Sequence, residues 1–144
     1  MRFPDGTLGT YIRDVAAVSA PGQAVLPVVG GRIVLVEHFR HAVRGWSLEI
    51  PRGFGEAGFS AEESARVVCL TPLGSLHVDA GMSADPVSLF HAEIDGVGAF
   101  DAAEGIGAVR LAAPAELAEL ISSGAVTDGY TMAAYLRASL RGLL

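Results

Sequence analysis

With 144 residues, 51% of them hydrophobic and 18% charged, the chain is too apolar to be disordered and long enough to form one domain with a core over residues 1–144. The net charge of −6 and the scattered positions of the 10 Lys and Arg residues exclude an extended phosphate-binding surface, so no nucleic-acid partner is expected. The single cysteine excludes an internal disulfide bond and no signal peptide is visible, so we expect a cytoplasmic protein. The apolar runs are too short or interrupted to span a bilayer, so no membrane partner is expected.

The first half of the chain has the pattern of β-strands. Four runs are rich in apolar and β-branched residues, which favours strands over helices. Gly30-Gly31 separates the second run from the third, and a glycine pair at this spacing predicts a tight β-hairpin. Pro51 closes the fourth run. The four runs are residues 10–18, 24–29, 32–38 and 46–50.

A helix is expected next, over residues 61–70. Ser60 provides an N-cap, and Glu63 completes a capping box at its start. Thr71-Pro72 should end this helix, since proline has no backbone N–H and restricts the residue before it. Cys69 lies in an apolar segment of the helix and is expected to be a small core residue rather than a nucleophile.

The second half of the chain alternates strands with helices. Pro114 suits the first position of a helix, and Gly124 suits the position that caps its C-terminus. The order of strands, helix, strands, helix and helix predicts a mixed sheet with helices packed on its faces. The expected strands are 75–78, 87–94 and 109–111, and the expected helices are 115–122 and 128–140.

Four segments, in a fixed order, carry a resemblance to a known family. Residues 32–42 are similar to the pattern R-V-L-L-V-x-Q-Y-R-x-A, and residues 46–53 to W-x-L-E-x-P-A-G. Residues 55–66 are similar to G-x-x-E-x-G-E-S-x-E-E-A-A-x, and residues 120–128 to L-I-x-x-G-x-I-x-D. The chain therefore resembles the Nudix superfamily, near the ADP-ribose and nucleotide-sugar pyrophosphatases. The resemblance implies an α/β Nudix fold, a mixed β-sheet sandwich flanked by helices, and a homodimer.

The catalytic box of that family is not preserved in this chain. The box reads G-x5-E-x7-R-E-U-x-E-E-x-G-U, where U is aliphatic; here Gly53 and Gly74 occupy its glycine positions, but Phe59 replaces its first glutamate. The resemblance assigns the missing glutamates to Mg²⁺ binding, and neutral side chains cannot replace hard carboxylate ligands. No metal site and no cofactor are therefore expected. The arginine and the other three glutamate positions hold Val67, Val68, Thr71 and Pro72.

Acidic residues outside the box keep an enzymatic alternative open. Glu56 lies on the loop before the expected helix, and Glu104 resembles an acid that relatives supply from an E-x-I loop. Together with Glu49, they are the candidate catalytic carboxylates of a divergent Mg-dependent pyrophosphohydrolase acting on ADP-ribose or a related nucleoside diphosphate derivative. The alternative for Glu56 and Glu104 is that both are solvated loop acids.

The resemblance also implies a ligand-binding cleft lined by Arg40, Glu49 and the glycine-rich loop that begins at Gly53. Arg40 matches a substrate-contacting arginine of the family, and a guanidinium suits phosphate recognition. The alternative is an ion pair of Arg40 with Glu37 or Glu49. His38 and His41 have no further ligands at a legible spacing, so they are not read as a metal site.

Two further residues near the cleft have open interpretations. Arg52 replaces a small residue of the family, and it either binds a phosphate or closes the cleft by pairing with an acid; we favour the pairing. Trp46 either stacks on a base, forms the wall of a dimer interface, or is buried in packing, which is the commonest fate of such an aromatic residue.

Two classes of function follow from this sequence. The first is a non-catalytic module that binds a nucleoside-diphosphate compound such as ADP-ribose or a nucleotide sugar, or that serves as a dimeric scaffold. The second is the divergent hydrolase, with Mg²⁺ as its cofactor. The loss of the box carboxylates favours the first class.

Overall fold

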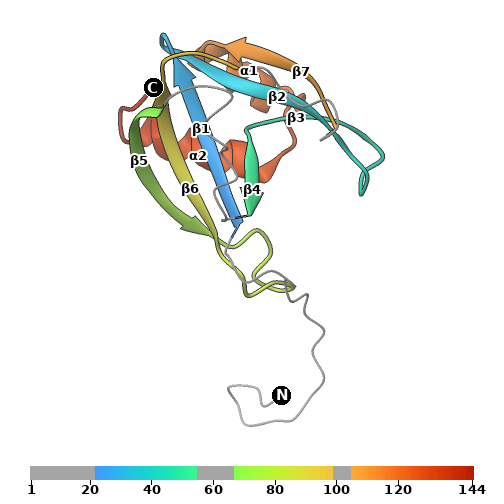
Figure 1. The fold of residues 1–144 in the computed structure, drawn as a ribbon. Coiled ribbons are helices and arrows are strands. Elements are labelled where there is room, and N and C mark those ends of the chain that lie inside the picture. Colours follow the sequence, from blue (N-terminus) through green and yellow to red (C-terminus); the bar gives the residue numbers. More distant parts are fainter. Residues whose placement is uncertain (1–21, 55–66, 99–104) are drawn as a thin grey trace, which may run out of the picture.

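The structure is a computed structural model that describes residues 22–54, 67–98 and 105–144. These residues form seven strands and two helices (Figure 1). The predicted strand over residues 10–18 lies outside them. The elements are β1 Gly22–Val29, β2 Arg32–Arg40, β3 Gly45–Glu49, β4 Arg52–Phe54, β5 Val67–Leu76, β6 Val87–Ile94, β7 Ile106–Ala112, α1 Pro114–Ser122 and α2 Gly129–Leu140.

The strands form one mixed sheet. Its order is β3-β2-β1-β6-β5, with β4 also paired to β1 and β7 also paired to β2. The β1 and β6 strands run parallel, in register from Gln23 opposite Ser88 to Val28 opposite Glu93, and the other pairs are antiparallel. Strands β3 and β5 therefore lie at the two ends of the strand order.

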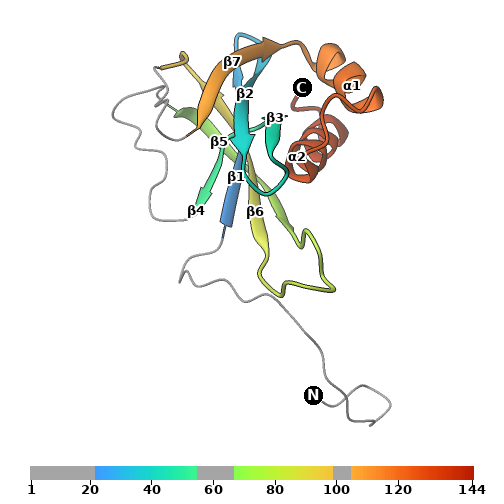
Figure 2. The same cartoon turned by 90° about the vertical axis from the view of Figure 1, so that its right-hand side faces the viewer.

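Both helices lie on the same side of the sheet (Figure 2). The α2 helix packs on β1, β5 and β6, and α1 packs on β2 and β7. The core between helices and sheet is apolar: Leu26, Leu89 and Leu73 from the strands meet Ala134 and Ala138 from α2, and all five are almost fully buried. This burial of one sheet face and one helix face is the main force that holds the elements together.

Several local predictions are confirmed. Gly30 and Gly31 form the β1–β2 turn with φ of +55° and +74°, the left-handed backbone at both central positions that a tight hairpin requires. The helices at 114–122 and 129–140 agree with the two predicted C-terminal helices. The strand predicted over 87–94 has these bounds in the structure.

The helix predicted over 61–70 is wrong where it can be compared. Val67–Leu70 belong to β5, and residues 61–66, with the capping box at Ser60 and Glu63, lie outside the described residues. Pro72 lies inside this strand, where it is tolerated because β5 is an edge strand with an irregular register between Pro72 and Gly74. Cys69 is exposed on this edge and is not a core residue, which corrects the second prediction for this segment.

Neither of the two helices that the structure describes has the length and apolar character needed to cross a membrane.

Candidate functional site

A buried carboxylate marks the most polar part of the described interior. Glu49 is the last residue of β3 and only 1% exposed. Arg40 donates to it from both Nε, at 3.2 Å from Oε2, and Nη2, which bonds Oε1. Arg52 Nη2 donates to Oε2 at 3.3 Å, and His38 Nδ1 lies 3.7 Å from Oε1. Because a buried carboxylate without partners is very costly, the hydrogen bonds from the two guanidinium groups are what make the buried position of Glu49 tolerable.

The pairing of β2 with β3 brings these side chains together. Val36 lies opposite Glu49, His38 opposite Ser47 and Arg40 opposite Gly45. Successive residues of a strand point to opposite faces, and residues directly opposite each other share a face. Glu49, His38 and Arg40 therefore project from the same face of the β2–β3 pair.

The network continues to the start of α2. Arg52 Nη1 donates to Asp128 Oδ1 at 2.8 Å, and the Asp128 side chain is 7% exposed. Asp128 is the N-cap of α2 and accepts bonds from the backbone N–H of Thr131 at 2.9 Å and from its hydroxyl at 2.7 Å. The same hydroxyl accepts a bond from the backbone N–H of Ile50 at 2.9 Å. The β3–β4 connection is thus tied to the N-terminus of α2.

Tyr130 borders the network on α2. The Arg52 guanidinium carbon lies 4.8 Å from the centre of the Tyr130 ring, a cation–π geometry. Burial raises the pKa of Tyr130, and this shift is partly opposed by the charge of Arg52. Arg52 is therefore held by Glu49, by Asp128 and by an aromatic face at once.

We call this set the Glu49 cluster: His38, Arg40, Glu49, Arg52, Asp128, Tyr130 and Thr131. Its two carboxylates balance its two guanidinium groups. The side chains of Arg40 and Arg52 are still 28% and 24% exposed. Each guanidinium has five N–H donors, and the bonds to Glu49 and Asp128 use two on each. The cluster can therefore offer further donors to an anion.

The cluster is not suited to a divalent metal. Both oxygens of Glu49 are bonded to guanidinium groups, which would have to leave before a cation could bind. Across residues 22–54, 67–98 and 105–144, no group of three or more His, Cys, Asp or Glu side chains is arranged to hold a metal ion. Glu56 and Glu104, the candidate catalytic carboxylates, lie outside these ranges.

Three of the predicted ligand-binding residues are brought together in this cluster: Arg40, Glu49 and Arg52. Arg40 pairs with Glu49, one of the two acids predicted as its partner. Arg52 pairs with two acids, Glu49 and Asp128. Gly53 follows Arg52 in β4, where it pairs with Gln23 of β1.

Trp46 does not share this face. It pairs with Phe39, so it projects from the opposite side of the β2–β3 pair, and its ring packs edge-on against Phe39 at 5.5 Å. It is 61% exposed, so the expectation that it is buried in packing is wrong. The reason is its position on β3, an edge strand. The ring covers Gly107 of β7, where an added Cβ would lie 2.7 Å from it.

Sequence reasoning did not identify Asp128, Tyr130 and Thr131 as parts of a site. An aspartate at the expected start of a helix, followed three residues later by a threonine, is a signal for the N-cap. No local signal connects Asp128 with Arg52, which is 76 residues away in the sequence.

Comparisons with known proteins give a match in structure only. No protein-family model matches the sequence, and no curated protein matches it. Among solved structures, the crystal structure of an ADP compounds hydrolase superposes with a TM-score of 0.77 at 14% sequence identity, over 99% of this chain and 83% of that chain. At 14% sequence identity, the match shows that the two chains share a fold. The predicted fold class, an α/β fold with a mixed sheet and packed helices, is thereby confirmed, and it is the fold of that ADP compounds hydrolase.

Proposed function

We propose that residues 1–144 form a single Nudix-like domain that binds a nucleoside-diphosphate compound, such as ADP-ribose or a nucleotide sugar, without hydrolysing it. The observation that carries this proposal is the pair of guanidinium groups in the Glu49 cluster. Arg40 and Arg52 are held on the buried Glu49 and on Asp128, yet a quarter or so of each side chain is open to solvent. The similar fold belongs to an ADP compounds hydrolase, which supports this class of ligand.

Preorganisation favours the binding of a diphosphate at this position. A free arginine loses side-chain entropy when it binds a ligand, whereas Arg40 and Arg52 are already ordered by the carboxylates that they contact. A guanidinium also matches phosphate oxygens in a two-point geometry that an ammonium group lacks. The same carboxylates repel an anion, so we expect moderate rather than tight affinity.

The box positions support the absence of hydrolysis. Val67, Val68, Thr71 and Pro72 occupy the arginine and glutamate positions of the box, and these side chains supply no charged oxygen to a metal ion. All four lie in the edge strand β5. Since the Glu49 carboxylate is occupied by two arginines, a magnesium-dependent mechanism would depend on acids such as Glu56 and Glu104.

Binding is tested by calorimetric titration of the full chain with ADP-ribose, a nucleotide sugar and ADP, each with and without Mg²⁺. We expect saturable binding that does not require Mg²⁺. Arg40→Lys and Arg52→Lys should each weaken it about tenfold, since each removes a charge-assisted two-point contact. Arg110→Lys is the matched control, because Arg110 also pairs with an acid, Glu116, but lies on β7 and is 43% exposed. Equal losses in all three variants would contradict the site.

Hydrolysis is tested separately, by measuring phosphate-containing products from the same compounds with Mg²⁺ or Mn²⁺. We expect no turnover. Turnover that disappears in Glu56→Gln or Glu104→Gln would replace this proposal with the divergent pyrophosphohydrolase.

The homodimer implied by the family resemblance belongs to the same proposal. Edge strand β5 exposes Val67 and Leu70 by 40% and 52%, and exposed apolar residues on a strand edge are typical of protein–protein contacts. Light scattering during size-exclusion chromatography should give twice the mass of the 14.9 kDa chain. A mass equal to that of one chain at every protein concentration would contradict the dimer and, with it, the role as a dimeric scaffold.

A further inference from the structure

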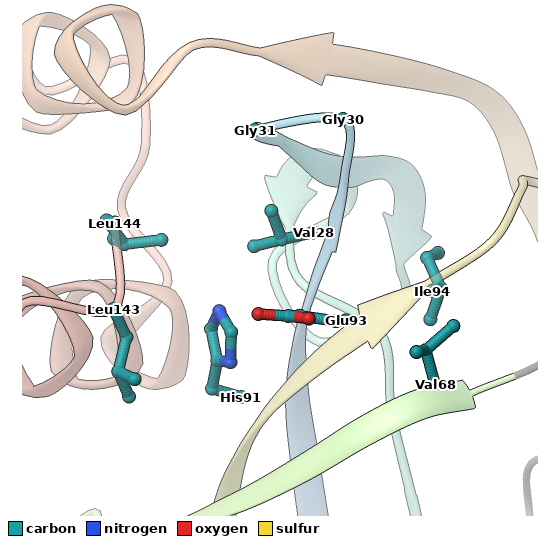
Figure 3. Close-up of a pocket in the computed structure, with 9 residues that line it drawn as sticks. All are labelled: Val28, Gly30, Gly31, Val68, His91, Glu93, Ile94, Leu143 and Leu144. Carbon is teal, nitrogen blue, oxygen red and sulfur yellow. The ribbon is translucent and has the colours of Figure 1, made fainter.

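A pocket lies at the far end of β1 from the Glu49 cluster. It has a volume of about 330 Å³ and is formed by the β1–β2 turn, β6, the end of β5 that holds Val68, and the last two residues of the chain (Figure 3). Arg52 pairs with Ala24 near the start of β1, whereas the pocket begins at Val28. Four residues of a strand span on the order of 13 Å, so the two sites are separate. The lining residues are Val28, Gly30, Gly31, Val68, His91, Glu93, Ile94, Leu143 and Leu144.

His91 lines the buried part of this pocket. Its side chain extends from β6 toward the space between Leu143 and Val28 (Figure 3), and the residue is only 2% exposed. Its Nε2 atom is buried and has no hydrogen-bond partner among residues 22–54, 67–98 and 105–144. A buried polar atom without a partner is costly, and native proteins satisfy nearly all such atoms with protein, water or ligand groups. Since His91 lines the pocket, a donor group of a molecule bound there is a candidate for the partner that this atom lacks.

The ring is suited to accept a hydrogen bond. Burial lowers the pKa of His91, an effect that the nearby Glu93 carboxylate partly opposes. The ring is accordingly neutral at pH 7, and a neutral imidazole presents one nitrogen as an acceptor. A neutral ring also does not repel a cation.

The remaining lining residues define the chemistry of a fitting ligand. Glu93 is the one charged side chain among the nine, and its carboxylate lies next to the His91 ring in Figure 3. No lysine or arginine lines the pocket, so no positively charged side chain is present to bind an anion beside the Glu93 carboxylate. The other walls are apolar, with Val28 and Ile94 from the sheet and Leu143 and Leu144 from the end of the chain. A fitting molecule has a cationic N–H group and a short hydrocarbon part.

We infer that this pocket is a binding site for a small organic amine in its ammonium form. The ammonium group donates one hydrogen bond to Nε2 of His91 and pairs with the Glu93 carboxylate, and its hydrocarbon chain contacts Leu143 and Leu144. A pocket of this volume lies at the small end of the range for ligand sites, which suits an amine of a few carbons. The site is independent of the function proposed for the Glu49 cluster.

The test uses the full chain labelled with ¹⁵N and three probes of equal length: pentylammonium, pentan-1-ol and pentanoate at pH 7. Side-chain ¹⁵N resonances of His91 and backbone resonances of Val28, Gly31 and Leu144 report on the pocket. We expect a saturable shift of these resonances with pentylammonium, binding of pentanol that is weaker by at least threefold, and no saturable shift with pentanoate. Binding of pentanoate at least as tight as that of pentylammonium would overturn the inference, and so would a pocket that holds water only and gives no saturable shift with any probe.

Matched variants separate the two polar contacts. His91→Phe keeps a ring of similar size but removes the acceptor, and it should weaken pentylammonium binding about tenfold. Glu93→Gln should weaken it about threefold, because exposed charge pairs contribute little. Glu119→Gln removes an exposed acid on α1 that does not line the pocket, and it should leave binding unchanged. If Glu93→Gln and Glu119→Gln weaken binding equally, the site is refuted. The wild-type titration decides the question even if His91→Phe does not fold.

Discussion

Glu49→Gln is the substitution that most directly tests whether the buried ion pairs of the Glu49 cluster stabilise the fold. Glutamine has the shape of glutamate but no charge. The change leaves Arg40 without its ionic partner and removes one of the two acids that hold Arg52. Glu49 is 1% exposed, and breaking a fully buried ion pair costs about 3–5 kcal/mol. The arginine side chains are 28% and 24% exposed, so water recovers part of this loss.

We therefore expect the free energy of unfolding to fall by about 2–3 kcal/mol, between the values for buried and exposed pairs. For a chain of this length that corresponds to a decrease in Tm of roughly 5–10 °C. Urea denaturation followed by circular dichroism measures the free energy of unfolding, and calorimetry measures Tm. The matched control is Glu116→Gln, which breaks an ion pair with Arg110 whose two side chains are 37% and 43% exposed.

The control should lower stability by less than about 1 kcal/mol. If Glu49→Gln costs no more than Glu116→Gln, the buried cluster does not stabilise the fold, and the reasoning from burial and pairing is refuted.

Three further predictions concern other parts of the chain. Asp128→Ala removes both the N-cap of α2 and a partner of Arg52, and should lower the free energy of unfolding by about 1–3 kcal/mol in urea denaturation, whereas Asp128→Asn should retain most of the cap. Gly107→Ala places a Cβ 2.7 Å from the exposed Trp46 ring and should displace the ring. We expect the Trp fluorescence maximum to shift to longer wavelength and the free energy of unfolding to fall by less than about 1 kcal/mol. An unchanged spectrum would contradict the contact. Because the folded-state pKa of His91 is lowered, its contribution to stability is complete above the unfolded-state pKa of about 6.5 and is lost as pH falls through the folded-state pKa. Denaturation between pH 7 and pH 4 should therefore show a smaller acid-induced loss for His91→Phe than for the wild type.

Much of the secondary structure was determined by short-range patterns in the sequence. The glycine pair at 30–31 requires a turn, because few other residues adopt left-handed backbone at two successive positions. Pro114 and Asp128 mark the starts of the two helices through the backbone groups that a helix N-terminus leaves unpaired. The pairing of Arg40 with Glu49 was also accessible as one of two alternatives, since the two residues lie on neighbouring strands.

The errors concern position within the sheet. The apolar run Val67–Leu70 fits either a helix or a strand, and only the pairing of β5 with β6 decides for the strand. Cys69 and Trp46 are exposed because β5 and β3 lie at the ends of the strand order. Whether a strand lies at the edge depends on the order of all the strands in the sheet, so a local sequence pattern does not predict it.

In this protein, the sequence by itself thus determined the turn and the helix starts. The tertiary structure decided which side chains contact one another. Arg52 and Asp128 meet across 76 residues, and the buried His91 of β6 lines a pocket together with Leu143 and Leu144, which lie far from it in the sequence. Contacts of this kind depend on how whole elements pack, and burial then gives the same side chain a different pKa and a different energy from those it has in water.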